Sequence, residues 1–211
     1  QAALARRRVP PALARRLLKD DNAAIRRLTV LALAASGTLE ATKVLIEMEA
    51  ERNWQVRVAQ LLAFAQLPSL PEAEPFLVSR LQERNTAWSA LAALAIGRVG
   101  GEGVVGILLR NQRSALRSPK LLALGSLIGR MPAHPKAEEV VSYLAQWAQA
   151  PKGARLTGFF EVYAALWALA ATGREDAREV LLQRAVEFDS PVLRGVALRL
   201  AGATKPPTLD V

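Results

Sequence analysis

The 211-residue chain contains no cysteine, one histidine, two tyrosines and four tryptophans. Without cysteine, neither a disulfide framework nor a thiolate metal site can form. With His134 as the single histidine, a His/Cys metal site or a Ser–His or Cys–His nucleophile system cannot be assembled. His134 lies between Ala133 and Pro135 in an expected turn, where we predict a solvated side chain. We therefore predict no catalytic residue, no metal site and no cofactor.

Long apolar runs are also lacking. The stretches Leu28–Ala35 and Val162–Ala171 are much shorter than the roughly 20 residues that span a bilayer, and no signal-peptide pattern is visible. We expect a cytoplasmic protein. An alternative is the soluble part of a membrane-anchored protein, because Arg6, Arg7 and Arg8 would suit the cytoplasmic flank of an upstream spanning helix.

The residues that are abundant favour helices. Hydrophobic residues make up 51% of the chain and charged residues 22%, which is enough apolar material for a buried core. The apolar residues are mainly alanine and leucine, which suit close-packed helices better than a pleated sheet. The composition predicts an all-α fold.

An internal repeat recurs at a spacing of about 32 residues. The segment Asn53–Pro68 aligns with Asn85–Gly100 after a shift of 32, and Ile96–Val99 aligns with Ile128–Met131 after another 32. In the other direction, Asn53 aligns with Asn22 after a shift of 31. Such periods are typical of repeat architectures built from stacked supersecondary units.

Each repeat predicts two helices. The first helix carries apolar residues at i, i+3, i+4 and i+7 and ends at a glycine or proline, such as Gly37 or Gly173. Capping-box spacing at the start of second helices relates Ser69 to Glu72 and Thr172 to Glu175, while Ser190-Pro191 opens a first helix with a cap followed by proline. The connections are short, so successive helices are expected to pack antiparallel.

The pattern resembles the HEAT repeat family, in particular its bacterial short-repeat members. The matching pieces are Asn53-Trp54-Gln55-Val56-Arg57 and the ending Ile96-Gly97-Arg98-Val99-Gly100. The resemblance implies an all-α, right-handed α–α superhelix, a solenoid of about five helical hairpins with a half-repeat at each end. We expect a single repeat domain over 1–203 and a tail or linker over 204–211. The expected units lie near 9–21 (half), 22–51, 53–84, 85–114, 117–150, 152–188 and 190–203 (half).

The half-repeats leave two alternatives open. They are either polar caps of a complete domain, or the chain is excised from a longer solenoid, since a stacked unit cannot bury its apolar face alone. A start at Gln1 instead of methionine keeps the second alternative open. Either end would also allow weak self-association by stacking on another copy.

Aromatic and acidic clusters have structural interpretations. Phe159, Phe160, Tyr163 and Trp167 form the densest aromatic group, and we expect it in the core, although an apolar groove there would be a binding surface. Trp88 and Trp147 fall on apolar stripes and are expected to be buried, whereas Trp54 is expected to be partly exposed. The acidic pairs Glu138-Glu139 and Glu175-Asp176 suit the first turns of second helices, where they complement the helix dipole.

The net charge of +9 makes nucleic acid a candidate partner. The expected first helices are strongly basic and the second helices are net acidic. In HEAT repeats the second helices line the concave face, so the resemblance implies an acidic concavity, which disfavours a duplex. The candidate binding residues are basic: Arg110, Arg113, Arg117 and Lys120 around one inter-repeat loop, together with Arg98 and Arg130.

We therefore expect a non-catalytic scaffold or adaptor that binds a protein partner, as part of a longer protein or assembly. An acidic surface favours a basic or amphipathic ligand. The alternative is a DNA-binding protein or an alkylated-base DNA glycosylase of the HEAT-like type, which would need Trp and Asp or Glu converging in a concave pocket. A third alternative, a lyase that attaches bilin chromophores, rests on the shared repeat alone.

Overall fold

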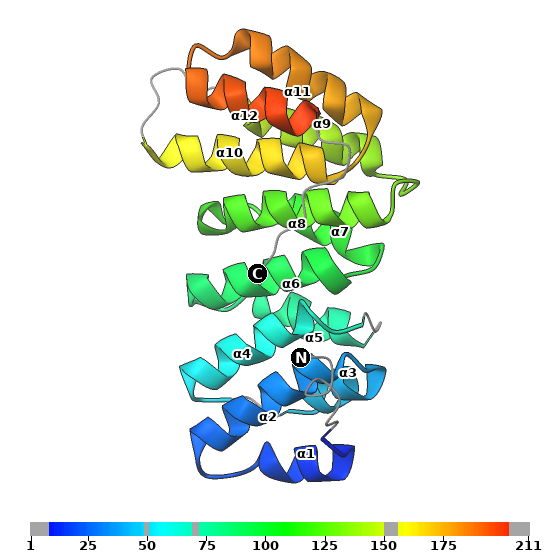
Figure 1. The fold of residues 1–211 in the computed structure, drawn as a ribbon, viewed down its shortest axis with the longest axis vertical. Helices are drawn as coiled ribbons and strands as arrows, with labels where there is room; N and C mark the ends of the chain where they lie inside the picture. Colours follow the sequence, from blue (N-terminus) through cyan, green and yellow to red (C-terminus); the bar gives the residue numbers. More distant parts are fainter. Residues whose placement is uncertain (1–8, 49–50, 69–71, 150–155, 203–211) are drawn as a thin grey trace. The chain divides into compact units, whose positions relative to one another are not determined.

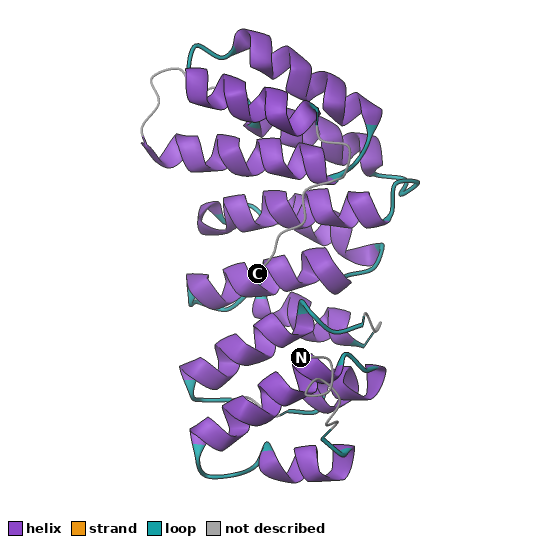
Figure 2. Cartoon of the chain, in the orientation of Figure 1, coloured by secondary structure: helices purple, strands orange, loops and turns teal. Residues whose placement is uncertain are grey.

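The computed structural model describes residues 9–48, 51–68, 72–149 and 156–202. Within these ranges the regular structure is helical and contains no strand (Figure 2), so the expected all-α class is confirmed. None of the helices in this part of the chain is both long and apolar enough to cross a bilayer.

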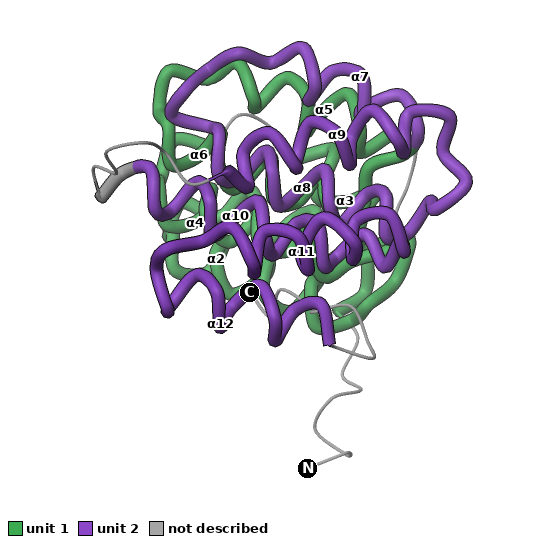
Figure 3. The backbone as a smooth tube through the Cα atoms, turned by 90° about the horizontal axis from the view of Figure 1, so that it is seen from above, with its two compact units in different colours: residues 1–101 green, residues 102–211 purple. Residues whose placement is uncertain are grey.

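The chain divides into two compact units, residues 1–101 and 102–211, coloured separately in Figure 3. The helices of unit 1 are α1 (Pro11–Leu17), α2 (Ala23–Ser36), α3 (Leu39–Ile46), α4 (Trp54–Phe64), α5 (Ala73–Arg80) and α6 (Thr86–Val99). Those of unit 2 are α7 (Gly103–Arg110), the short 3-10 helix η2 (Ser114–Leu116), α8 (Arg117–Arg130), α9 (Ala137–Trp147), α10 (Leu156–Ala171), α11 (Glu175–Glu187) and α12 (Pro191–Ala201).

Alternate helices of unit 1 pack into two layers. In one layer α2 packs on α4 and α4 on α6, and in the other α1 packs on α3 and α3 on α5 (Figure 1). Large apolar side chains such as Leu45, Phe64 and Leu77 are fully buried in this unit. Alanines such as Ala59 and Ala92 are buried as well, and they keep neighbouring helices close.

Unit 2 repeats this packing. Helix α8 packs on α10 and α10 on α12, while α9 packs on α11. Helices α8 and α10 come into backbone contact, because a Cβ added at Gly125 would lie 2.3 Å from the carbonyl oxygen of Ala168. A Cβ at Gly129, one turn later, would lie 2.2 Å from the carbonyl oxygen of Ala171. These two glycines set the spacing of the helix pair.

The repeated asparagines are helix caps. The Oδ1 atoms of Asn22, Asn53 and Asn85 accept hydrogen bonds from backbone N–H groups in the first turns of α2, α4 and α6. Gly37 ends α2 with a φ of 60°, a left-handed conformation that glycine adopts without strain. Ser190 caps α12 and Pro191 is its first residue, as expected.

One expected capping box is wrong. Helix α11 begins at Glu175, but its N-cap is Arg174, whose side chain makes no capping bond. The Thr172 hydroxyl instead donates to the carbonyl oxygen of Leu169, and it accepts from the Arg174 N–H. The other expected box, Ser69 with Glu72, falls partly outside the described residues.

The helices follow the order expected from the repeat. Successive pairs from α2–α3 to α10–α11 lie within the expected units, with α1 and α12 in the two half-repeats. The boundary between the compact units falls after Gly101, between α6 and α7, inside the expected unit 85–114. The single domain over 1–203 stays a prediction, and the expected tail 204–211 lies outside the described residues.

Candidate interaction surfaces

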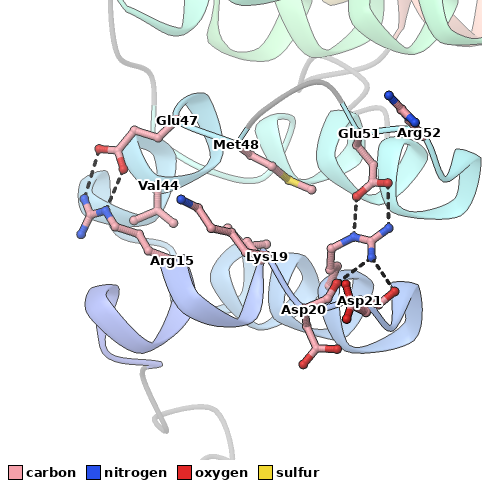
Figure 4. A pocket seen from close by; sticks show the side chains of 11 residues that line it. Arg15, Lys19, Asp20, Asp21, Val44, Glu47, Met48, Glu51 and Arg52 are labelled. Carbon is pink, nitrogen blue, oxygen red and sulfur yellow. Dashed lines mark hydrogen bonds and ion pairs between the residues drawn. The ribbon is translucent and has the colours of Figure 1, made fainter.

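A groove of about 710 Å³ lies between α1 and α3 in unit 1 (Figure 4). The apolar residues that line it are Leu18, Val44 and Met48, and its other lining residues carry charges of both signs. The charged residues that line it are Arg15, Lys19, Asp20, Asp21, Arg26, Glu47, Glu51 and Arg52. Helices α1 and α2, the turn between them and the segment after α3 contribute these charged side chains.

Two arginine–carboxylate clamps bracket the groove. Arg15 on α1 donates to Glu47 at 2.7 and 3.1 Å and to Glu40 at 3.2 Å. Arg26 on α2 donates to both carboxylate oxygens of Glu51, at 2.8 and 2.9 Å. These two-point contacts fix the geometry of both carboxylates as well as their charge.

The clamps keep the groove carboxylates ionised. Hydrogen bonds from Arg15 lower the pKa of Glu47, and hydrogen bonds from Arg26 lower the pKa of Glu51. The Asp20 carboxylate accepts a hydrogen bond from the Asn22 N–H at 2.8 Å. Because a general acid or base works best with a pKa near the operating pH, the shifts of Glu47 and Glu51 suit fixed charges and not proton transfer.

Lys19 and Arg52 are the two groove cations whose side chains make no hydrogen bond or ion pair with the described residues. Figure 4 shows the Lys19 side chain extending toward Val44, with no hydrogen bond to the residues of either clamp. Among the described residues, no partner accepts a hydrogen bond from its ammonium group. The groove therefore offers apolar side chains, the exposed cations Lys19 and Arg52 and the exposed carboxylate of Asp21, whereas Glu47 and Glu51 are bound by arginines and Asp20 accepts a backbone N–H.

The basic loop of unit 2 is only partly exposed. Arg110 ends α7 on the surface, and Arg113, half-buried, precedes η2. Arg117 forms an ion pair with Glu161 at 2.6 Å and lies over the Trp147 ring at 4.2 Å. Lys120, a candidate binding residue, does not lie on the surface, because it is buried and donates to the carbonyl oxygen of Asn111 at 2.7 Å.

The other two candidate residues end first helices on the surface. Arg98 lies at the end of α6 in unit 1, where its Nε donates to the carbonyl oxygen of Ala65 at 3.3 Å. Arg130 is the last residue of α8 in unit 2. Their role in binding stays a prediction.

The aromatic group of α10 is not in the core. Phe160 is 69% exposed and Tyr163 is 38% exposed, while Phe159 and Trp167 are half-buried. The Tyr163 ring neighbours two of the others: its centroid lies 6.5 Å from that of Phe159 and 6.3 Å from that of Trp167. Phe160 and Tyr163 therefore face outward, and the buried face of α10 is built from smaller side chains such as Ala165 and Leu169.

Two tryptophans expected in the core are half-buried under guanidinium groups. Arg57 lies over the Trp88 ring at 4.1 Å, as Arg117 does over Trp147. Cation–π contacts of this kind keep the ring edge near solvent while its face is covered. Trp54 is 61% exposed, which confirms the prediction that it is partly exposed.

His134 is buried, contrary to the expected solvated turn. Its Nδ1 accepts from the Lys136 N–H at 3.0 Å, so the neutral ring carries its proton on Nε2, which lies 3.2 Å from the carbonyl oxygen of Glu102. The histidine thus joins the start of α9 to the start of α7. Glu102 lies 32 residues before His134, which is the spacing of the repeat. This spacing is the sequence signal that could have predicted their contact.

The described residues contain no group of three or more histidine, aspartate or glutamate side chains placed to hold a metal ion. No protein-family model matches the sequence, and no curated protein matches it.

Proposed function

We propose that the chain is a non-catalytic scaffold that binds a protein partner, and that the groove between α1 and α3 holds an amphipathic segment of that partner. The observation that carries the proposal is the chemistry of this groove: apolar side chains beside the cations Lys19 and Arg52, with Glu47 and Glu51 held by arginines. A segment with an apolar residue for Met48 and a carboxylate for Lys19 is complementary to it.

The sequence alone suggested a basic ligand for an acidic surface. The groove favours the opposite sign, because Arg15 and Arg26 already bind Glu47 and Glu51. At Glu47 and Glu51 a basic ligand would have to compete with these clamps, which leaves it Asp21, whereas an acidic ligand meets the two cations Lys19 and Arg52.

The proposed architecture is the right-handed α–α superhelix of HEAT-like repeats, forming one interaction domain of a longer protein or assembly in the cytoplasm. It is supported by the two helix layers within each unit and by the asparagine caps that recur with the repeat.

The nucleic-acid alternative is weakened by how the basic side chains are used. Arg26, Arg57 and Arg117 are in ion pairs, and Lys120 donates to a carbonyl oxygen. Each cation bound internally is one fewer to neutralise a phosphate, and duplex affinity scales with that number.

The test is selection of displayed random 12-residue peptides on the purified chain, followed by affinity measurements with the selected peptides. We expect Lys19→Glu to weaken groove-binding peptides at least tenfold, because it places a carboxylate where the ligand's own would bind. Lys43→Glu is the matched control, because it changes the charge by the same amount. Lys43 is exposed on α3 and does not line the groove. Equal affinities for wild type and Lys19→Glu, or an equal loss in both variants, would contradict the proposal.

A further inference from the structure

A second hollow lies between α2 and α4 in unit 1 and shares no lining residue with the groove. Its volume is about 170 Å³. The residues that line it are Arg27, Leu31, Trp54, Gln55, Val58, Ala59 and Leu62. These helices are neighbours in one layer of the unit (Figure 1).

The side chains around this hollow are unusually apolar for a surface. Trp54 is 61% exposed and Leu31 is 42% exposed, and Leu28, which adjoins Arg27 in the sequence, is 65% exposed. Large apolar side chains gathered on a surface are typical of interaction sites, and tryptophan is over-represented among residues that dominate binding energy.

The charge at the hollow has one sign. Arg27 is exposed and lines it, and no acidic residue does. Within the described residues, Arg27 has no carboxylate or carbonyl oxygen bound to its guanidinium group. In this it differs from its neighbour Arg26, which is held by Glu51 and by the carbonyl oxygens of Asp20 and Asp21.

We propose that this hollow is a second docking site, which takes one large apolar side chain of a protein partner with a carboxylate close beside it. An apolar cavity of about 150 Å³ accommodates a benzene ring, so the hollow is large enough for one leucine-sized or aromatic side chain. The carboxylate pairs with Arg27 in the two-point geometry that guanidinium groups favour. The site goes beyond the proposed function, because it lies outside the groove and has its own anchor.

The experiment uses the full chain and the same display library, with selected peptides measured by fluorescence anisotropy. We expect a class of peptides with an apolar residue near Asp or Glu, whose affinity falls at least tenfold in Leu31→Ser. Arg27→Gln should weaken these peptides about tenfold, and it should have little effect on versions in which the acid is replaced by its amide.

Each variant has a matched control on α1. Leu13→Ser removes a leucine of similar exposure, 44%, and Arg16→Gln removes an exposed arginine, and neither residue lines the hollow. Circular dichroism and thermal unfolding are measured for every variant, to check that each variant is folded. Affinity unchanged in the controls and lost in Leu31→Ser and Arg27→Gln supports the site.

Three results overturn the inference. The first is a failure to select any peptide sensitive to Leu31→Ser. The second is an equal effect of Arg27→Gln on acidic and amide peptides. The third is single-stranded oligothymidylate binding that displaces the peptides and is lost in Arg27→Gln, which assigns the hollow to nucleic acid. If every selected peptide is lost in Lys19→Glu and none is affected by Leu31→Ser, the hollow is contradicted and the proposed function still stands.

Discussion

In several first helices, the side chain of the fourth residue after the N-cap donates a hydrogen bond to a backbone carbonyl oxygen of the preceding turn. Arg26 donates to the carbonyl oxygen of Asp20, and Ser89 to that of Glu83. Lys120 reaches Asn111 in the same way, and Arg194 reaches Phe188. The position is polar in each case because it faces the carbonyl groups of the turn, which need donors when they are shielded from water. Much of the positive charge on the first helices thus has a structural role.

The Arg26–Glu51 clamp predicts a pH-dependent contribution to stability. The pKa of Glu51 is lowered in the folded chain, so its contribution is fully present above the ordinary glutamate pKa of about 4.3 and is lost as the pH falls through the folded value. We expect Glu51→Gln to lower the free energy of unfolding by about 2 kcal/mol at pH 7, as for a hydrogen bond to a charged group. The difference from wild type should shrink as the pH falls below the ordinary glutamate pKa and through the lowered pKa of Glu51.

Urea unfolding at a series of pH values measures this difference. Glu72→Gln is the control, because Glu72 is exposed and makes no capping hydrogen bond. A difference between Glu51→Gln and wild type that stays constant over the whole pH range would contradict the assigned role of the clamp.

At the scale of helices, the asparagine caps were predictable and the outer faces were not. Asn22, Asn53 and Asn85 recur with the repeat, and each caps the helix that follows it. Helix α10 is apolar on nearly all sides, so its periodicity did not show that Phe160 and Tyr163 face outward. The burial of Lys120 could not be predicted either, because it depends on a carbonyl group that the sequence does not place.

The α8–α10 contact predicts opposite effects for two glycine substitutions in unit 2. Gly125→Ala should lower the free energy of unfolding by about 2 kcal/mol or more, because the new Cβ meets the backbone of Ala168 and the helices must separate. Gly195→Ala on α12 should be neutral or stabilising by up to about 1 kcal/mol, because a Cβ there meets no atom within 4 Å and alanine favours a helix.

Thermal and urea unfolding of both variants provide the comparison. Similar shifts for Gly125→Ala and Gly195→Ala would show that α8 and α10 do not approach as closely as described.

At the scale of the whole molecule, the two candidate classes of partner differ in how they respond to salt. The net charge of +9 gives some affinity for any polyanion at low salt. Of the candidate basic residues, Lys120 is buried and Arg117 forms an ion pair with Glu161, so neither is free to bind a phosphate. The repeat order was predictable from the spacing near 32 residues, whereas the groove between α1 and α3 was not, because it depends on which arginine meets which carboxylate.

We therefore expect duplex DNA to bind more weakly than about 1 µM at physiological salt, within the range of non-specific binding. Replacement of Arg110 and Arg113 by glutamine should change this affinity little. Fluorescence anisotropy across a salt series measures both quantities. Micromolar or tighter binding, with a steep salt dependence that is lost in the double variant, would favour the DNA-binding alternative.

The most direct test of the scaffold account is the hydrogen-exchange footprint of a selected peptide on the full chain. We predict slower exchange in α1 and α3, whose side chains form the groove, and no such change with the peptide on the Lys19→Glu variant. Protection confined to other helices, or protection in α1 and α3 that persists in Lys19→Glu, would contradict the claim that this groove recognises the partner.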